Sequence, residues 1–306
     1  MKKEHANTVS RRTFLKGAGA AAASLALGGC GFGEKLFFSR DVAEKLFQSH
    51  FKKMDSDEIE KVKSRLQKQY KKKYGREFVL GTEPPYPDVL FAYALDLSRC
   101  IGCRRCVYAC VQENNQSRRP QIQWIRVLRF KDGTLKFEDA EHYYEAGMVP
   151  VEGYYTMPVQ CQQCENPPCV KVCPTKATWK EPDGIVVVDY NWCIGCRYCL
   201  AACPYWARRF NFADPEIPKG ELNQNLHYLG NRPRMRGVVE KCTFCIQRTR
   251  KGRYPACVEA CPVGARKFGN ILDPDSEISM VLKKQRVFRL KEDLNTQPKF
   301  YYFFSI

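Results

Sequence analysis

Sixteen of the seventeen cysteines of this chain fall into four quartets with the spacing of ligand sets. Two intervening residues let a tight loop direct successive thiolates toward one point, and the third quartet has the C-x2-C-x2-C-x3-C-P run of bacterial two-cluster ferredoxins. The quartets therefore predict four [4Fe-4S] clusters, and a row of clusters is a path for electrons. In chain order they are Cys100, Cys103, Cys106 and Cys110; Cys161, Cys164, Cys169 and Cys173; Cys193, Cys196, Cys199 and Cys203; and Cys242, Cys245, Cys257 and Cys261.

In the ferredoxin run the fourth cysteine ligates the neighbouring cluster, so quartets work in pairs. Only nineteen residues (174–192) separate quartets two and three, which favours pairing them and leaves quartets one and four to pair around them. Tandem pairing, one with two and three with four, is not excluded by spacing. The nested pairing predicts set A (Cys100, Cys103, Cys106, Cys261), set B (Cys242, Cys245, Cys257, Cys110), set C (Cys161, Cys164, Cys169, Cys203) and set D (Cys193, Cys196, Cys199, Cys173).

Three alternative roles for the cysteines compete with cluster binding. Exported disulfide scaffolds are usually small, and their cysteines do not recur as four similar quartets. Structural zinc takes two C-x2-C knuckles per ion, which fits poorly with three cysteines in rapid succession followed by Cys-Pro. A degenerate quartet would lack a sulfur, and every quartet keeps all four.

The N-terminus carries an export signal. Arg11 and Arg12 precede a weakly apolar stretch, 17–29, which is typical of a twin-arginine signal peptide. That route moves folded cargo, which suits a protein whose clusters are built before export. The seventeenth cysteine, Cys30, follows a lipobox-like Leu-Gly-Gly and predicts lipid attachment at the membrane surface; cleavage nearby, with Cys30 left as a spare thiol, is the alternative.

The net charge of the chain bears on which kinds of partner it can bind. The formal net charge of +17 resembles that of a nucleic-acid binder, but residues 1–29 contribute +4 of it (five basic residues minus one acidic), leaving +13. Each oxidised cluster with four thiolates carries about −2, so four of them bring the holoprotein to roughly +5. Export also separates the chain from nucleic acid. No apolar run of eighteen or more residues follows the signal, so the sequence predicts no spanning helix.

The elements that must position the cysteines follow a repeated order. A short strand is expected before the first quartet at 90–96 and before the third at 185–189, so the body is predicted to repeat strand, cluster loop and short helix. Upstream, Ile59, Val62, Leu66 and Tyr70 recur at helical spacing. The predicted fold class is α+β: two nested ferredoxin-like dicluster units with long loop insertions and an N-terminal helical extension. The predicted domains are a signal peptide (1–29), a charged helical extension and linker (30–87), a four-cluster core (88–272) and a C-terminal tail (273–306).

Residues 88–305 resemble a known family through specific motifs. These are Pro158–Cys164 (P-V-Q-C-Q-Q-C), Asn166–Cys169 (N-P-P-C), Cys193–Cys199 (C-I-G-C-R-Y-C) and Glu240–Cys245 (E-K-C-T-F-C). The sequence resembles the four-cluster iron–sulfur subunits of the dimethyl-sulfoxide reductase superfamily, in the style of the polysulfide reductase and formate-linked nitrite reductase subunits. The resemblance implies the nested pairing and four [4Fe-4S] clusters. Residues 34–80, a prologue to the cluster-binding core, lie outside the usual core of the family.

By this resemblance the chain would relay electrons at the outer face of the cytoplasmic membrane. Its partners would be an integral-membrane quinone-interacting subunit and a catalytic molybdopterin or multihaem cytochrome subunit. A self-contained enzyme is the rival hypothesis, but it would need an open iron site, and no quartet lacks a ligand. The four histidines (His5, His50, His142, His227) form no metal or triad pattern, so no catalytic residue is predicted.

Overall fold

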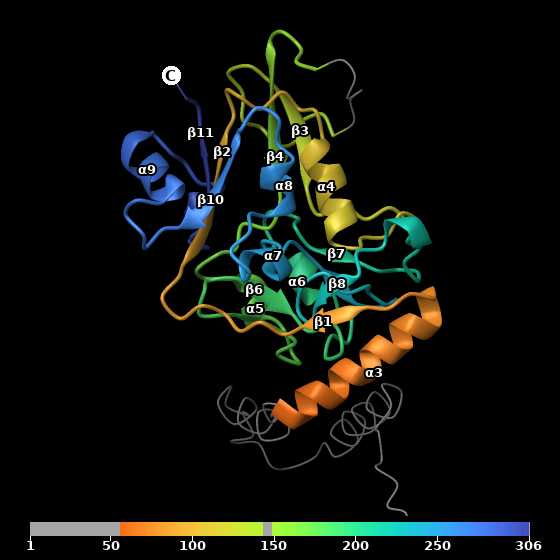
Figure 1. The fold of residues 1–306 in the computed structure, drawn as a ribbon. Helices are drawn as coiled ribbons and strands as arrows, with labels where there is room; N and C mark the ends of the chain where they lie inside the picture. Colours follow the sequence, from red (N-terminus) through yellow and green to blue (C-terminus); the bar gives the residue numbers. More distant parts are fainter. Residues whose placement is uncertain (1–55, 143–148, 306) are drawn as a thin grey trace, which may run out of the picture. The chain divides into compact units, whose positions relative to one another are not determined.

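The computed structural model describes residues 56–142 and 149–305, which belong to one compact unit. A three-stranded sheet in the order β10 (Arg266–Asn270), β2 (Phe91–Asp96), β11 (Phe300–Phe303) runs through it (Figure 1). Strand β2 pairs antiparallel with β10 and parallel with β11. The segment 273–306, expected to be a tail, thus contributes a strand to the sheet that carries β2.

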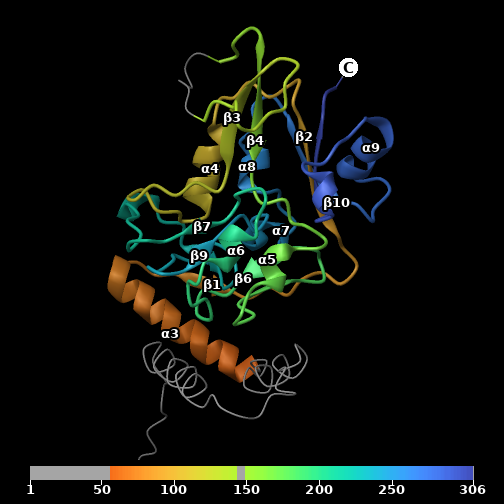
Figure 2. The same cartoon turned by 180° about the vertical axis from the view of Figure 1, so that it is seen from behind.

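Strand β2 is buried along its whole length because both of its faces are covered. Its small residues Ala92 and Ala94 pack with Ile278 of helix α9 (Glu277–Lys284), which lies against this sheet in Figure 2. The larger Tyr93 points into the main core and stacks on Phe300, with 4.6 Å between ring centroids. Alternation of small and large side chains follows the two-residue period of a strand.

The same succession of elements surrounds every quartet. A strand precedes each one, and a helix that contains its third cysteine follows, which confirms the expected repeat and the α+β class. The four successions are β2 to α4 (Arg105–Glu113), β4 (Tyr154–Val159) to α5 (Pro168–Lys171), β6 (Val186–Val188) to α6 (Tyr198–Ala201), and β9 (Val239–Glu240) to α8 (Ala256–Glu259).

The remaining strands form two-stranded pairs between the quartets. Antiparallel pairs join β3 (Arg126–Lys131) to β4, β5 (Thr178–Lys180) to β6, and β7 (Arg209–Phe210) to β9. The eleven residues between Cys245 and Cys257 are partly helical. They begin with helix α7 (Ile246–Thr249), all four residues of which are buried. The described residues also contain two 3₁₀ turns, η2 (Lys219–Glu221) and η3 (Glu292–Leu294).

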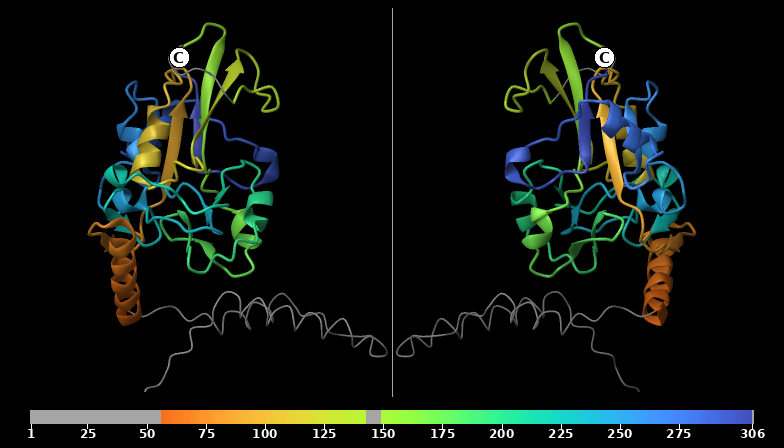
Figure 3. Two further views of the ribbon diagram at one scale, coloured as in Figure 1. Left: turned by 90° about the vertical axis from the view of Figure 1, so that its right-hand side faces the viewer. Right: turned by 90° about the vertical axis from the view of Figure 1, so that its left-hand side faces the viewer.

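Helix α3 (Ser56–Tyr74) lies where the helical spacing places one, and it ends before Gly75, whose φ of +69° suits glycine. Its buried side chains Leu66, Tyr70 and Tyr74 pack with apolar residues of β1 (Val79–Gly81), of β8 (Asn225–His227) and of the segments on either side of η2. Figure 3 shows α3 and the β3–β4 hairpin at opposite ends of this unit. The predicted signal peptide (1–29), Cys30 and the earlier part of the extension lie outside the described residues.

Within the described ranges, no helix has both the length and the apolar character to cross a bilayer.

Candidate metal centres

None of the sixteen quartet cysteines forms a disulfide, and Cys196 is the one among them that is exposed. The thiols of quartets one and four meet in space. Cys100, Cys103 and Cys106 line one small cavity together with Cys261, which is the last cysteine of quartet four. Helix α4 packs against α8, the two helices that carry the third cysteines of these quartets. Four sulfurs therefore gather around one space, although their positions in the sequence are up to 161 residues apart (Cys100 to Cys261).

Burial and neighbouring thiols raise the pKa values of Cys106, which lines this cavity, and of Cys110. Burial raises the pKa of Cys106 to about 11, and Cys257 and Cys100 add to the increase. Burial likewise raises the pKa of Cys110 well above its usual value, with Cys245, Cys242 and Cys257 as the nearby thiols. Cys110 of quartet one thus lies beside three thiols of quartet four.

Quartets two and three show the same exchange of fourth cysteines. Burial raises the pKa of Cys164 to about 12, and Cys161, Cys169 and Cys203 contribute. Burial also raises the pKa of Cys193, whose neighbours include Cys173 and Cys196. Cys203 therefore lies among thiols of quartet two, and Cys173 lies among those of quartet three.

Hydrogen-bond donors reach several of the sulfurs. Gln116 Nε2 lies 3.1 Å from Cys110 Sγ, and Thr156 Oγ1 lies 3.4 Å from Cys100 Sγ. Asn114 Nδ2 lies 3.6 Å from the sulfurs of both Cys110 and Cys245. Donors of this kind stabilise a charged sulfur and tune the potential of a cluster that it binds.

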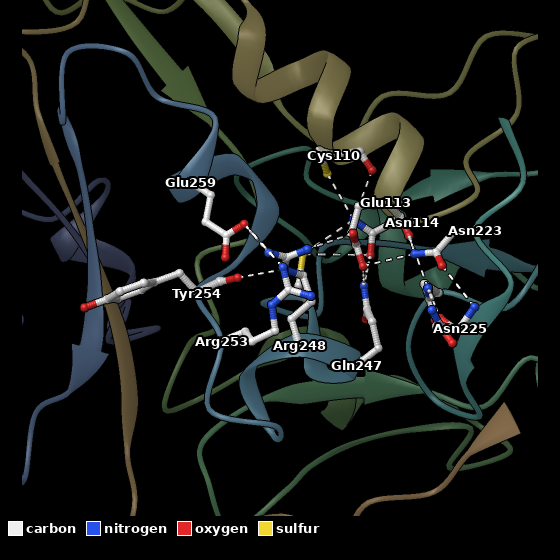
Figure 4. A network of polar contacts seen from close by, with 12 residues as sticks. Cys110, Glu113, Asn114, Asn223, Asn225, Gln247, Arg248, Arg253, Tyr254 and Glu259 are labelled. Carbon is white, nitrogen blue, oxygen red and sulfur yellow. Dashed lines mark hydrogen bonds and ion pairs between the residues drawn. The ribbon is translucent and has the colours of Figure 1, made fainter. Parts of the chain in front are cut away.

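A polar network holds Asn114 in place beside these sulfurs (Figure 4). Gln247 Nε2 donates to Asn114 Oδ1 at 3.2 Å and to Glu113 Oε1 at 3.1 Å. Arg248 then forms ion pairs with Glu113, at 3.1 Å, and with Glu259. The network ties the end of α4 to α7 and α8, the elements that present Cys110, Cys245 and Cys257.

These residues fit [4Fe-4S] clusters. Clustered thiols repel one another when they ionise, so binding them together as thiolates needs a cationic centre, and an iron–sulfide core supplies one. Among the described residues, no three His, Cys, Asp or Glu side chains converge closely enough to hold a single metal ion. A [4Fe-4S] core spreads its four thiolates more widely than one ion does.

The aromatic residues within and just after quartet three differ in burial. Tyr205 is buried, and its hydroxyl lies 3.2 Å from the carbonyl oxygen of Leu290. Tyr198 and Trp206 are 63% and 50% exposed, so these two side chains are not part of the packed core.

Arg266, whose side chain lies 3.2 Å from the sulfur of Cys106, is not adjacent to a cysteine in the sequence. Arg105 is exposed, and Arg197 lies over the ring of Phe210, with 5.4 Å between its Cζ atom and the ring centroid. The buried arginines Arg208 and Arg266, each five residues after the last cysteine of a quartet, were missed. Their repeated position after Cys-Pro is the signal that would have found them.

Comparison with protein families matches two descriptions to this chain. A 4Fe-4S dicluster domain matches residues 99–177, and a second dicluster model matches residues 152–235 and 228–271. A twin-arginine translocation signal sequence matches residues 8–28. The dicluster matches cover all four quartets.

Three relatives match most of the chain. The Hdr-like menaquinol oxidoreductase iron-sulfur subunit 1 of Archaeoglobus fulgidus is 42% identical over 74% of this chain and 87% of its own length. One chain of the polysulfide reductase of Wolinella succinogenes is 38% identical over 67% of this chain and 90% of its own length. One subunit of the selenate reductase of Mesobacillus selenatarsenatis is 35% identical over 98% of both chains, so the prologue 34–80 has a counterpart in that relative.

This protein is one of the four-cluster iron–sulfur electron-transfer subunits of the dimethyl-sulfoxide reductase superfamily. It binds four [4Fe-4S] clusters, which supply one-electron transfer, and it carries a twin-arginine export signal. The names of its relatives differ in substrate, so the similarity does not fix the terminal reaction.

Proposed function

We propose that this protein binds its clusters in the nested sets A to D and passes electrons along them in the order A–B–C–D. The observation that carries the pairing is the cavity that Cys100, Cys103 and Cys106 share with Cys261. The neighbours of Cys110, Cys164 and Cys193 support the other three sets.

Contacts between sets support the order. Cys257 of set B is among the charges that act on Cys106 of set A. Cys161 of set C acts in the same way on Cys242 of set B, and Cys169 of set C on Cys199 of set D. Each contact joins successive sets, so the four sets form one unbranched path.

Exposure supports sets A and D as the two ends of the path. All four cysteines of set B are buried, whereas Cys196 of set D is exposed. Three cysteines of set A are partly exposed (Cys100, Cys103 and Cys261), against two of set C (Cys161 and Cys203). Electrons would therefore enter and leave at sets A and D, where a partner can approach the outermost thiolates.

The partners follow from the family and the signal. We propose an integral-membrane subunit that reacts with quinone or quinol at one end of the path and a catalytic molybdopterin or multihaem cytochrome subunit at the other. Relatives named for menaquinol oxidation and menaquinone reduction support the first partner. The export signal supports a place on the outer face of the cytoplasmic membrane, and Cys30 would be acylated there.

Cluster content and pairing have a direct test in anaerobically purified full chain. Iron and acid-labile sulfide analysis should find about sixteen of each per chain. The variants Cys103→Ser, Cys261→Ser and Cys196→Ser are then compared by electron paramagnetic resonance. Nested pairing requires Cys103→Ser and Cys261→Ser to alter the same signal, because both cysteines belong to set A.

Under tandem pairing Cys261→Ser would instead share its altered signal with Cys196→Ser, and that result would reject the nested sets. Zinc without sulfide would reject the clusters altogether. Sustained turnover of a small substrate by the isolated protein would favour the rival hypothesis of a self-contained enzyme.

A further inference from the structure

Two arginines are buried beside the thiols without a carboxylate partner in the described part of the chain. Arg208 and Arg266 are only 4% and 3% exposed, and neither forms an ion pair with a described Asp or Glu. Other buried arginines do have such partners: Arg232 pairs with Asp189, Arg234 with Glu240 and Arg250 with Asp183. An uncompensated buried cation costs several kcal/mol, so the negative charge that balances these two must come from elsewhere.

Arg266 reaches thiols of two sets at once. Its Nη2 atom lies 3.2 Å from Cys106 Sγ of set A. Its Nη1 atom donates to the hydroxyl oxygen of Tyr93 at 3.0 Å, and that oxygen lies 3.3 Å from Cys257 Sγ of set B. A single guanidinium group is thus connected by hydrogen bonds to both clusters of the A–B pair.

Arg208 has the equivalent place between sets C and D. Its Nη2 atom donates to Thr178 Oγ1 at 3.0 Å, while Nε and Nη1 have no hydrogen-bond partner among the described residues. The thiols that interact most strongly with its guanidinium group are those of Cys169 (set C) and Cys199 (set D). The charge of Arg208 therefore also faces one thiol from each set of its pair.

The two arginines occupy the same position of the internal repeat. Residues 203–208 read C-P-Y-W-A-R and residues 261–266 read C-P-V-G-A-R, so each arginine comes five residues after the last cysteine of its quartet. Quartet two has Thr178 at this position, and Thr178 is the acceptor for Arg208. Each pair of sets thus receives one arginine, from the later of its two quartets.

A third buried cation, Lys241, differs from both. Its Nζ atom donates to the carbonyl oxygen of Cys242 at 2.7 Å and so is compensated by the backbone. The same atom lies 3.5 Å from Gln163 Oε1, so its hydrogen-bond partners in the described part of the chain are oxygens rather than sulfurs.

We propose that Arg208 and Arg266 are the resident counter-cations of the two cluster pairs and that each raises the reduction potentials of both clusters between which it lies. This inference rests on the proposed sets A to D. One-electron reduction takes a cluster with four thiolates from about −2 to about −3, so a fixed neighbouring cation stabilises the reduced form more than the oxidised form. Because the site is shielded from solvent, added salt screens this effect little.

The test is a redox titration of the full chain with its clusters, reduced by dithionite and followed by electron paramagnetic resonance. Arg266→Gln keeps a hydrogen-bonding side chain but removes the charge. We expect it to lower two of the four potentials by at least the equivalent of a tenfold change in the reduction equilibrium, about 59 mV for one electron. Arg208→Gln should lower the other two by a similar amount.

Two further variants separate charge from structure. Arg266→Lys restores the charge without the planar fork, and we expect it to recover more than half of the shift. Arg105→Gln removes an exposed charge next to the ligand Cys106 and is the matched control. Solvent screens that charge, so its effect should be less than a third of the effect of Arg266→Gln.

The proposal is overturned if both Gln variants hold about sixteen irons and keep the potentials of the unsubstituted chain, or if Arg105→Gln shifts them as far. If neither Gln variant assembles its clusters, the Arg266→Lys variant provides the test. Reduction potentials close to those of the unsubstituted chain support the role of the charge. A change of more than tenfold in the reduction equilibrium refutes it. Failure of the proposed function looks different. In that case the unsubstituted chain itself would hold too little iron, or Cys103→Ser and Cys261→Ser would alter different signals.

Discussion

His227 makes the packing of the β1–β8 pair dependent on pH. Its Nε2 atom lies 3.1 Å from the carbonyl oxygen of Glu83, and its Nδ1 atom accepts a hydrogen bond from the N–H of Leu229 at 3.1 Å. The neutral ring with its proton on Nε2 satisfies both contacts. A proton on Nδ1 would face the N–H of Leu229, and the ring is almost fully buried.

Burial lowers the pKa of His227 from 6.5 to about 4, and the positive charges of Arg250 and Lys251 act in the same direction, against the opposing effect of Glu83. As the pH falls below the usual pKa, the opened state takes up a proton first, so stability is lost. The loss between about pH 7 and about pH 4.5 is roughly 2 kcal/mol, because each unit of pKa difference corresponds to about 1.4 kcal/mol. Above about pH 7 the contribution is fully present.

Hydrogen exchange measures this loss without global unfolding. The N–H of Tyr228 donates to the carbonyl oxygen of Gly81 at 2.9 Å, so its exchange reports opening of the β1–β8 pair. After correction for intrinsic rates, its protection should fall by a factor of roughly 30 to 60 over this pH range, the equivalent of about 2 kcal/mol. Glu83 also titrates, but its pKa is lowered below 4.5 despite burial by its hydrogen bond with Lys251, so its contribution is lost at lower pH.

His227→Gln is the control variant, since its amide can donate to the Glu83 carbonyl oxygen but does not titrate. Its protection factor at Tyr228 should stay nearly constant from about pH 7 to about pH 4.5. If the variant and the unsubstituted chain lose protection in parallel, another group causes the effect and the reasoning about His227 is refuted.

Four further outcomes follow from the described contacts and the sequence. Leu66→Ala empties a buried position under α3, so α3 should lose about 2–5 kcal/mol of packing and become sensitive to limited proteolysis while the rest of the chain stays resistant. Phe300→Ala removes the ring stacked on Tyr93 and should cost about 3–5 kcal/mol, seen as faster loss of iron–sulfur absorbance on heating. Gln116→Leu removes the 3.1 Å donor to Cys110 Sγ and should lower the potential of the set B cluster alone; an unchanged potential would show that this donor does not tune it. Cys30→Ser should abolish labelling with radioactive palmitate, and equal labelling of both proteins would place the lipid elsewhere.

Sequence spacing predicted the parts of the structure that depend on local geometry. Each quartet needs a tight loop, and the helix containing its third cysteine follows directly, so the repeat is readable from the cysteines and prolines. The helical spacing of Leu66 and Tyr70 likewise locates α3, although the surface that it covers is distant in sequence.

Long-range packing could not be predicted in this way. Nothing near Phe300 indicates that it pairs with β2, because parallel pairing depends on strands far apart in the chain. The same is true of Arg266, whose role depends on Tyr93 and Cys106. Arg105 is adjacent to a cysteine in sequence and yet faces solvent, which shows that adjacency along the chain is a poor guide to the electrostatics of a sulfur.

The pairing of β2 with β10 and β11 has a consequence for biosynthesis. The N–H of Ser305 donates to Asp96, 209 residues earlier, so the sheet around β2 stays incomplete until that late segment has left the ribosome. At about 5–20 residues per second, translation of the intervening stretch takes roughly 10–40 s. During that time the apolar face of β2 and the first thiols are exposed to oxidation and aggregation.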